Sequence, residues 1–120
     1  MSRVLVIGVG AMGWNHVRVC SEIGVLCGVC DQSMSETDRV AEEYGVPGFY
    51  EVDNAIADLK PDAVIIATPT SSHYGIASKV IGNGIHVLIE KPISDDIQKA
   101  QQLVEMAREM DLVLSVGHIE

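Results

Sequence analysis

The sequence predicts an α/β fold, with a doubly wound parallel sheet of about six strands and helices on both faces. Short runs of valine and isoleucine alternate with segments of helical period throughout the 120 residues, and this alternation is typical of parallel sheets. Apolar residues make up 48% of the chain but aromatic residues only 4%. The core must therefore consist of aliphatic side chains, as the interior of a buried parallel sheet usually does.

The elements are expected to follow one another in a regular order. Strands are expected near residues 3–8, 25–31, 48–50, 63–68, 85–90 and 112–117, and helices near 11–23, 35–44, 51–58, 72–82 and 95–110. Most of the strands are short β-branched runs, and the helices are longer segments in which apolar residues recur every three or four positions. Right-handed crossovers join parallel strands of this kind. Doubly wound sheets bind ligands beyond the carboxyl ends of their strands, where the first and fourth strands diverge.

The last helix has the clearest pattern. Its apolar stripe consists of Ile97, Ala100, Leu103, Val104 and Ala107, which recur at the period of a helix that packs one face on a core. Ser94 is expected to cap its first turn, because serine side chains accept hydrogen bonds from free helix amides. Asp95 and Asp96 stand where the helix dipole favours acidic groups.

Length and charge exclude several classes of protein. With 120 residues the chain suits one domain, and it is short for a two-domain enzyme. Eight basic against seventeen acidic residues give a net charge of -9, which argues against nucleic acid or an anionic membrane as partner. The first apolar run leads into glycines instead of a cleavage site, and no segment has the length of a membrane span. We therefore expect a cytoplasmic protein.

Two of the three cysteines have the spacing of a redox or metal pair. Cys27 and Cys30 are three residues apart within one expected strand, where alternation would turn their thiols to opposite faces of the sheet. We therefore interpret both, together with Cys20, as small apolar residues in a reducing compartment.

A glycine turn joins the first strand to the first helix. Gly8, Gly10 and Gly13 have the spacing of a dinucleotide-binding turn. The first glycine permits the tight turn, the second lets the backbone approach a diphosphate, and the third lets helix and strand pack closely. Ala11 and Met12 begin the helix, whose free amides and dipole favour an anion. The turn therefore predicts a phosphate-binding site.

The second strand ends in an acid. Asp31 lies eighteen residues beyond Gly13, in the position from which a carboxylate holds the ribose diol of a dinucleotide. The residues that follow, Gln32 and Ser33, provide no cation for a 2'-phosphate. The sequence therefore favours NAD over NADP.

Small polar residues follow the fourth strand, which must end before a proline because proline cannot donate to a central ladder. The group consists of Thr68, Pro69, Thr70, Ser71, Ser72 and His73. We expect Thr68, Pro69, Thr70 and His73 to line the cofactor. For Ser71 and Ser72, capping of the next helix is the favoured interpretation.

Charged residues mark the end of the fifth strand. Glu90 and Lys91 precede Pro92, and two charges at a buried strand end are costly unless they are paired or used in function. The alternative is a surface ion pair beside a turn. His118 follows the sixth strand, where it either reaches the nicotinamide side of the crevice or caps the strand.

Taken together, these motifs resemble the Gfo/Idh/MocA family, which is named after glucose-fructose oxidoreductase, inositol dehydrogenase and a rhizopine-catabolism protein. The resemblance spans the chain and rests on Gly8-x-Gly10-x-x-Gly13 with His16, Asp31, Thr68-Pro69 with His73, Gly84-x-His86-Val87, Glu90-Lys91-Pro92 and Val116-Gly117-His118. One departure is Ile85, where relatives commonly carry lysine. Residues 12–16 and 116–120 are most similar to the branch of UDP-N-acetylglucosamine 3-dehydrogenases.

The resemblance implies an amino-terminal Rossmann domain that binds NAD or NADP, followed by a second domain that binds a sugar, sugar nucleotide or cyclitol. Residues 1–120 would be the first domain, and the second would supply an acid-base residue. Lys91 would stabilise the alkoxide during hydride transfer, and Glu90 would balance the charge. Without its second domain the chain would expose apolar surface that favours self-association. The alternative is a stand-alone NAD(H)-binding sensor without catalysis.

Overall fold

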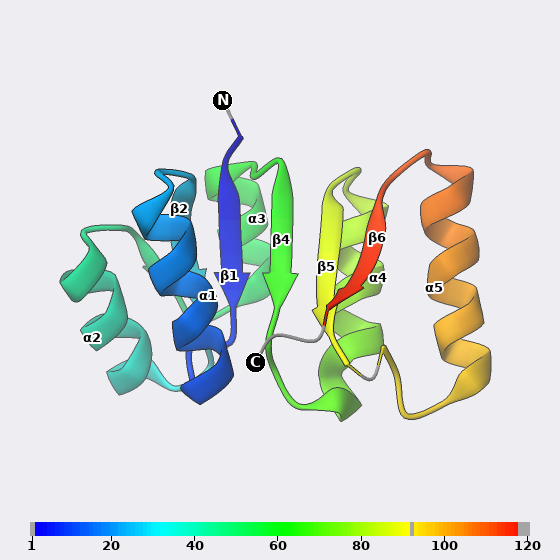
Figure 1. The fold of residues 1–120 in the computed structure, drawn as a ribbon, viewed down its shortest axis with the longest axis horizontal. Coiled ribbons are helices and arrows are strands. Elements are labelled where there is room, and N and C mark those ends of the chain that lie inside the picture. Colours follow the sequence, from blue (N-terminus) through cyan, green and yellow to red (C-terminus); the bar gives the residue numbers. More distant parts are fainter. Residues whose placement is uncertain (1, 92, 118–120) are drawn as a thin grey trace.

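The computed structural model of the chain describes residues 2–91 and 93–117 (Figure 1). The elements are β1 (Val4–Ile7), α1 (Ala11–Glu22), β2 (Leu26–Cys30), α2 (Met34–Tyr44), β3 (Gly48–Phe49), α3 (Val52–Leu59), β4 (Ala63–Ile66), a 3-10 turn (Thr70–Ser72), α4 (His73–Gly82), β5 (His86–Glu90), α5 (Ile97–Glu109) and β6 (Leu114–Gly117). Every predicted strand and helix is present, with boundaries that differ by at most two residues.

The six strands form one sheet in the order β3-β2-β1-β4-β5-β6, and every neighbouring pair is parallel. The predicted doubly wound fold is therefore confirmed. Strands β1 and β4 are adjacent at the centre, and the chain winds outward from them in opposite directions. Their carboxyl ends form the crevice in which such sheets bind ligands.

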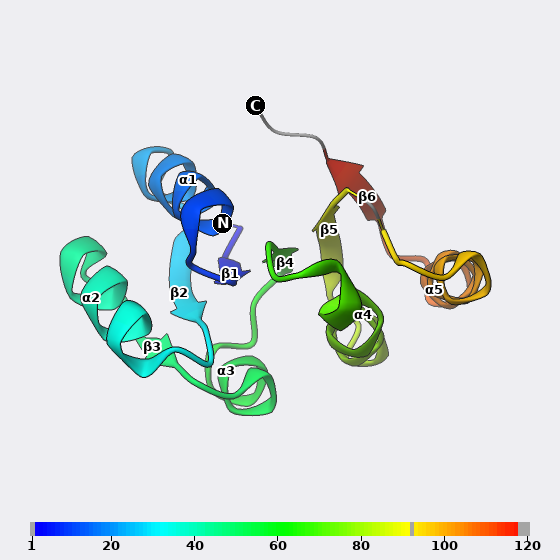
Figure 2. The ribbon, with the colours of Figure 1, turned by 90° about the horizontal axis from the view of Figure 1, so that it is seen from below.

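The helices divide between the two faces of the sheet (Figure 2). Helices α1 and α2 lie on one face, beside β1, β2 and β3, whereas α3, α4 and α5 lie on the other. In the part of the chain that the structure describes, the face that carries α1 has no helix over β5 and β6. Val113, which directly precedes β6, is 59% exposed. None of the described helices is long and apolar enough to cross a bilayer.

The core consists of one aliphatic layer on each face of the sheet. Along β1, Leu5 and Ile7 pack in the layer under α3 and α4, whereas Val6 packs in the layer under α1 and α2. All three side chains are at most 2% exposed. Burial of one such side chain contributes about 1.5–3 kcal/mol, so these layers fix the sheet and hold its strand ends in place.

The apolar stripe of α5 is narrower than predicted. Leu103 and Ala107 are buried, but Ile97 and Val104 are 77% and 41% exposed. The helix packs beside α4 and the edge of the sheet, where only one narrow face finds neighbours. The full predicted stripe was therefore wrong for these two positions.

The cap of α5 also differs from the prediction. Asp96 is the capping residue, and its carboxylate Oδ1 accepts hydrogen bonds from the amides of Gln98 (2.8 Å) and Lys99 (3.3 Å). The hydroxyl of Ser94 instead accepts from the amide of Asp96, at 3.2 Å. A carboxylate two residues closer to the helix has displaced the serine from the predicted role.

The cysteines are free thiols, but their arrangement corrects one prediction. Cys27 and Cys30 pack against the same core layer, because the register of β2 against β1 shifts between Leu26 and Gly28. Simple alternation therefore fails at Cys27. Burial raises the pKa of the thiols of Cys20, Cys27 and Cys30, as expected of small apolar residues.

Candidate dinucleotide site

The glycine turn lies at the carboxyl end of β1 and allows close approaches of the backbone. Gly8 has a φ of +97°, and a Cβ there would lie 2.7 Å from the backbone carbonyl of Ala67 after β4. A Cβ on Gly13 would overlap the carbonyl group of Gly8. Both glycines are therefore required by the packing of α1 and β4 around the turn, as the motif predicted.

Gly10 has a different environment. A Cβ there would meet no described atom within 4 Å, so the space beside this backbone is open. Gly10 is also the capping residue of α1, and it brings no side chain to the amides of the first turn, which begins at Ala11 and Met12. This cradle, which a larger residue would fill, fits the diphosphate of a dinucleotide.

Asp31 is held in one orientation beside the turn. Its carboxylate Oδ2 accepts a hydrogen bond from the amide of Val9, and Oδ1 accepts one from the amide of Ser33, both at 2.9 Å. The residue is half-buried and lines the cavity described below. A carboxylate fixed in this way needs no rearrangement to accept hydrogen bonds from the two hydroxyls of a ribose.

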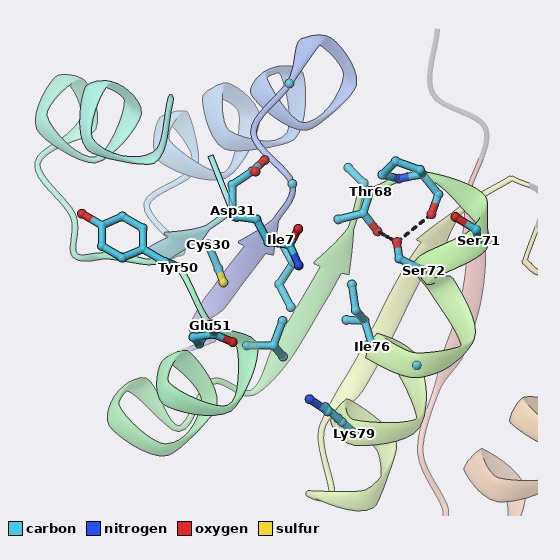
Figure 3. Close-up of a pocket in the computed structure, with 17 residues that line it drawn as sticks. Ile7, Cys30, Asp31, Tyr50, Glu51, Thr68, Ser71, Ser72, Ile76 and Lys79 are labelled. Atoms are coloured by element: carbon cyan, nitrogen blue, oxygen red, sulfur yellow. Dashed lines mark hydrogen bonds between the residues drawn. The ribbon is translucent and has the colours of Figure 1, made fainter. Parts of the chain in front are cut away.

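A cavity of about 620 Å³ opens at this edge of the sheet, between β2 and β4. Its walls include Gly8 and Gly10 of the turn, Asp31 and Gln32 after β2, Tyr50 and Glu51 between β3 and α3, Val52 of α3, Thr68, Pro69, Ser71 and Ser72 after β4, and Gly75, Ile76 and Lys79 of α4. Figure 3 shows the α3 and α4 walls facing each other across the opening. The cavity has the size of a small-molecule site.

Cys30 forms part of the cavity floor as a neutral thiol. Burial, together with the nearby carboxylates of Asp31 and Glu51, raises its pKa to about 12. At the opposite rim, the hydroxyl of Tyr50 donates to Asp38 Oδ1 at 2.5 Å, and this bond raises the pKa of Tyr50. The Cys30 part of the floor is thus uncharged at neutral pH, whereas Asp31, Glu51 and Lys79 bring charged groups to the cavity lining.

The turn after β4 only partly matches its prediction. Thr68 and Pro69 line the cavity, and so do Ser71 and Ser72, for which helix capping had been favoured. The hydroxyl of Ser72 lies 2.6 Å from both Thr68 Oγ1 and the carbonyl oxygen of Pro69. Ser72 is the capping residue of α4 by position, as predicted, but its hydroxyl is directed at the preceding turn and makes no capping hydrogen bond.

His73 and Thr70 lie outside the described cavity lining. His73 is 1% exposed, and its Nε2 lies 2.8 Å from the carbonyl oxygen of Thr68. This geometry has Nε2 donating to the carbonyl. The ring of His73 thus supports the turn that bears Thr68, and its predicted contact with the cofactor stays a prediction.

A contact that sequence reasoning missed joins the two halves of the sheet. His16 Nε2 of α1 contacts Glu90 Oε1 at the end of β5, with the two side chains only 5% and 13% exposed. Glu90 therefore pairs with His16, not with its neighbour Lys91. A histidine three positions after the last glycine of the turn was a signal, but its partner is 74 residues away.

Lys91 lies at the same edge of the sheet, directly after β5. Its backbone amide donates to the carbonyl of Gly117 at 3.1 Å, which continues the pairing with β6, and the residue is exposed. It lies one strand beyond Thr68, on the side away from Asp31. Two positions of the prediction, Pro92 and His118, lie outside the described residues.

Comparison with known proteins identifies the family. Residues 2–118 match the family described as "Oxidoreductase family, NAD-binding Rossmann fold", Gfo/Idh/MocA. UDP-N-acetylglucosamine 3-dehydrogenase of Acidithiobacillus ferrooxidans is 42% identical over 118 residues, which cover 98% of this chain and 37% of the relative. The scyllo-inositol 2-dehydrogenase (NAD(+)) of Bacillus subtilis is 33% identical over 122 residues, which cover 96% and 35% of the two chains.

Solved structures of the same family have the same fold as this chain. The structure of the Acidithiobacillus ferrooxidans enzyme, GnnA, matches with a TM-score of 0.91 at 40% identity, over 97% of this chain and 36% of GnnA. GenD2 from gentamicin A biosynthesis, solved in complex with NAD, matches with a TM-score of 0.91 at 33% identity, over 98% and 35%. The chain thus spans little more than a third of the length of these relatives. It belongs to the Gfo/Idh/MocA oxidoreductase family and corresponds to the NAD-binding Rossmann domain of that family.

Proposed function

We propose that this chain is the cofactor domain of a dehydrogenase that oxidises a secondary alcohol of a sugar, sugar nucleotide or cyclitol. The observation that carries the proposal is the orientation of Asp31, which the amides of Val9 and Ser33 hold at the cavity beside the glycine turn. The named activities of the relatives support the substrate class.

The nicotinamide cofactor supplies the hydride acceptor when it is bound. The chain's own residues bind and orient the cofactor. The first turn of α1 would hold the diphosphate, and Asp31 would accept hydrogen bonds from the ribose. Lys91, exposed at the end of β5, donates to the substrate oxygen and stabilises the negative charge that develops there as the hydroxyl proton leaves. The carboxylate of Glu90 is already paired with His16.

The alcohol itself would bind to a second domain, which would also provide the acid-base residue. Two observations support this part of the proposal. The relatives are almost three times as long as this chain, and no described helix covers β5 and β6 on the face of α1 (Figure 2). We further propose the cytoplasm as the location, since all three cysteines are free thiols. We also propose that the isolated chain self-associates through the exposed residues around β6, which a second domain would otherwise cover.

The first prediction concerns the choice of cofactor. We expect the chain to bind NADH about tenfold to a hundredfold more tightly than NADPH. A 2'-phosphate would replace the ribose hydroxyl that donates a hydrogen bond to Asp31, and the negative charge of Asp31 would repel the phosphate. Charge-assisted hydrogen bonds of about 1.5–3 kcal/mol set this range. Titration of each nucleotide against the fluorescence of Trp14, the only tryptophan, measures both dissociation constants.

The control for this prediction is the variant Asp31→Ser, which should bind the two nucleotides with similar affinity. Equal affinities in the unchanged chain would remove Asp31 from the assigned role. Binding of neither nucleotide would overturn the proposed function. The chain alone should oxidise no sugar nucleotide or cyclitol, and steady turnover by residues 1–120 would refute the need for a second domain.

A further inference from the structure

The part of the cavity between α3 and α4 carries residues that neither the glycine turn nor Asp31 accounts for. Glu51 and Val52 come from the start of α3, and Ile76 and Lys79 come from α4 on the opposite wall. In Figure 3 these walls enclose the space that continues beyond Asp31, away from the glycine turn. A dinucleotide with its diphosphate on the turn and its ribose at Asp31 would direct its base into this space.

Two of these residues provide apolar walls. Val52 and Ile76 are both half-buried aliphatic residues, one on each side of the cavity. Together with the neutral thiol of Cys30 on the floor, they offer apolar surface to the faces of a flat ring. Such walls favour an aromatic base without distinguishing one base from another.

The other two residues carry opposite charges toward the same space. Glu51 is exposed, and its carboxylate is close enough to the Cys30 thiol to affect its pKa. The ammonium of Lys79 lies 3.3 Å from Asp53 Oδ2, in a pair whose side chains are 51% and 71% exposed. An ion pair this exposed is weak, so Lys79 can turn to a ligand in the cavity at little cost.

We propose that Glu51 and Lys79 read the edge of an adenine base: Glu51 accepts a hydrogen bond from the exocyclic amino group, and Lys79 donates one to the neighbouring ring nitrogen. The proposal rests on the proposed dinucleotide binding. An amino donor beside a ring-nitrogen acceptor is the hydrogen-bonding pattern of adenine. Hypoxanthine has a carbonyl acceptor beside a ring N–H donor, so the same two side chains would disfavour it.

The test compares two nucleotides on the full chain. NADH and reduced nicotinamide hypoxanthine dinucleotide differ only in the base, and fluorescence titration gives both dissociation constants. We expect the hypoxanthine form to bind about tenfold more weakly, since it leaves a carboxylate facing a carbonyl. In Glu51→Gln the ratio of the two dissociation constants should fall toward one, because an amide can form hydrogen bonds with either base edge. Lys79→Met should also lower the preference.

The matched control is Asp58→Asn, which removes the same charge from α3, the helix that Glu51 precedes, at an exposed position outside the cavity lining. It should keep the full preference for NADH. Equal binding of both nucleotides by the unchanged chain, or an unaltered preference in Glu51→Gln, would overturn this assignment while leaving NADH binding intact. Failure to bind either nucleotide would instead overturn the proposed function.

Discussion

Replacing Gly13 with alanine will lower the free energy of unfolding by about 3 kcal/mol or more, at the upper end of what overpacking costs. The new Cβ would overlap the backbone carbonyl of Gly8, and backbone atoms cannot rotate away as a side chain can. Helix α1 would have to move off the turn, and buried Val17 would lose its place in the core. Urea denaturation followed by circular dichroism measures the change.

Gly82→Ala is the control for this experiment. Gly82 ends α4, and a Cβ added there would meet no described atom within 4 Å. Alanine at this position should therefore leave stability unchanged or raise it by up to about 1 kcal/mol. If both variants unfold at the same urea concentration as the unchanged chain, the close approach of α1 to the turn is wrong.

Replacing His16 with alanine will lower the free energy of unfolding by about 2–4 kcal/mol. The carboxylate of Glu90, whose side chain is 13% exposed, would lose the ring that it contacts. A largely buried charge without a partner costs far more than the contact itself contributes. Denaturant titration at neutral pH measures the loss.

Arg18→Ala on the same helix is the comparison. The Arg18–Glu22 pair, at 3.3 Å, joins side chains that are 43% and 62% exposed, so its removal should cost about 0.5 kcal/mol or less. The double variant His16→Ala with Glu90→Ala should lose less stability than the sum of its single variants, because no carboxylate remains buried. A His16→Ala variant as stable as Arg18→Ala would contradict the burial of this pair.

Local sequence patterns were enough for the fold. Aliphatic runs that alternate with helical segments specify both the elements and their parallel pairing, and the glycine spacing locates the turn after β1. Asp31 was found because it ends a strand, and its approach to the turn follows from the neighbouring positions of β1 and β2. Its two amide partners depend on the local path of the backbone, which no residue pattern encodes.

The remaining residues of the candidate site depend on contacts between distant segments. Glu51 reads as an ordinary acid before a helix and Lys79 as an ordinary helix lysine, and only the sheet order brings α3 opposite α4. The partner of His16 lies at the end of β5, far along the chain. Competition between nearby groups explains the rest, as where Asp96 caps α5 in place of Ser94.

The bond between His16 and Glu90 has a consequence for ligand entry. The halves of the molecule that include α1 and β5 are joined by the pairing of β1 with β4, and this bond joins them a second time, at the carboxyl ends of the strands. Spreading the halves apart would break a largely buried polar contact. The spacing of the two halves beside the proposed phosphate site is therefore preset, and a nucleotide would bind there without spreading the strands.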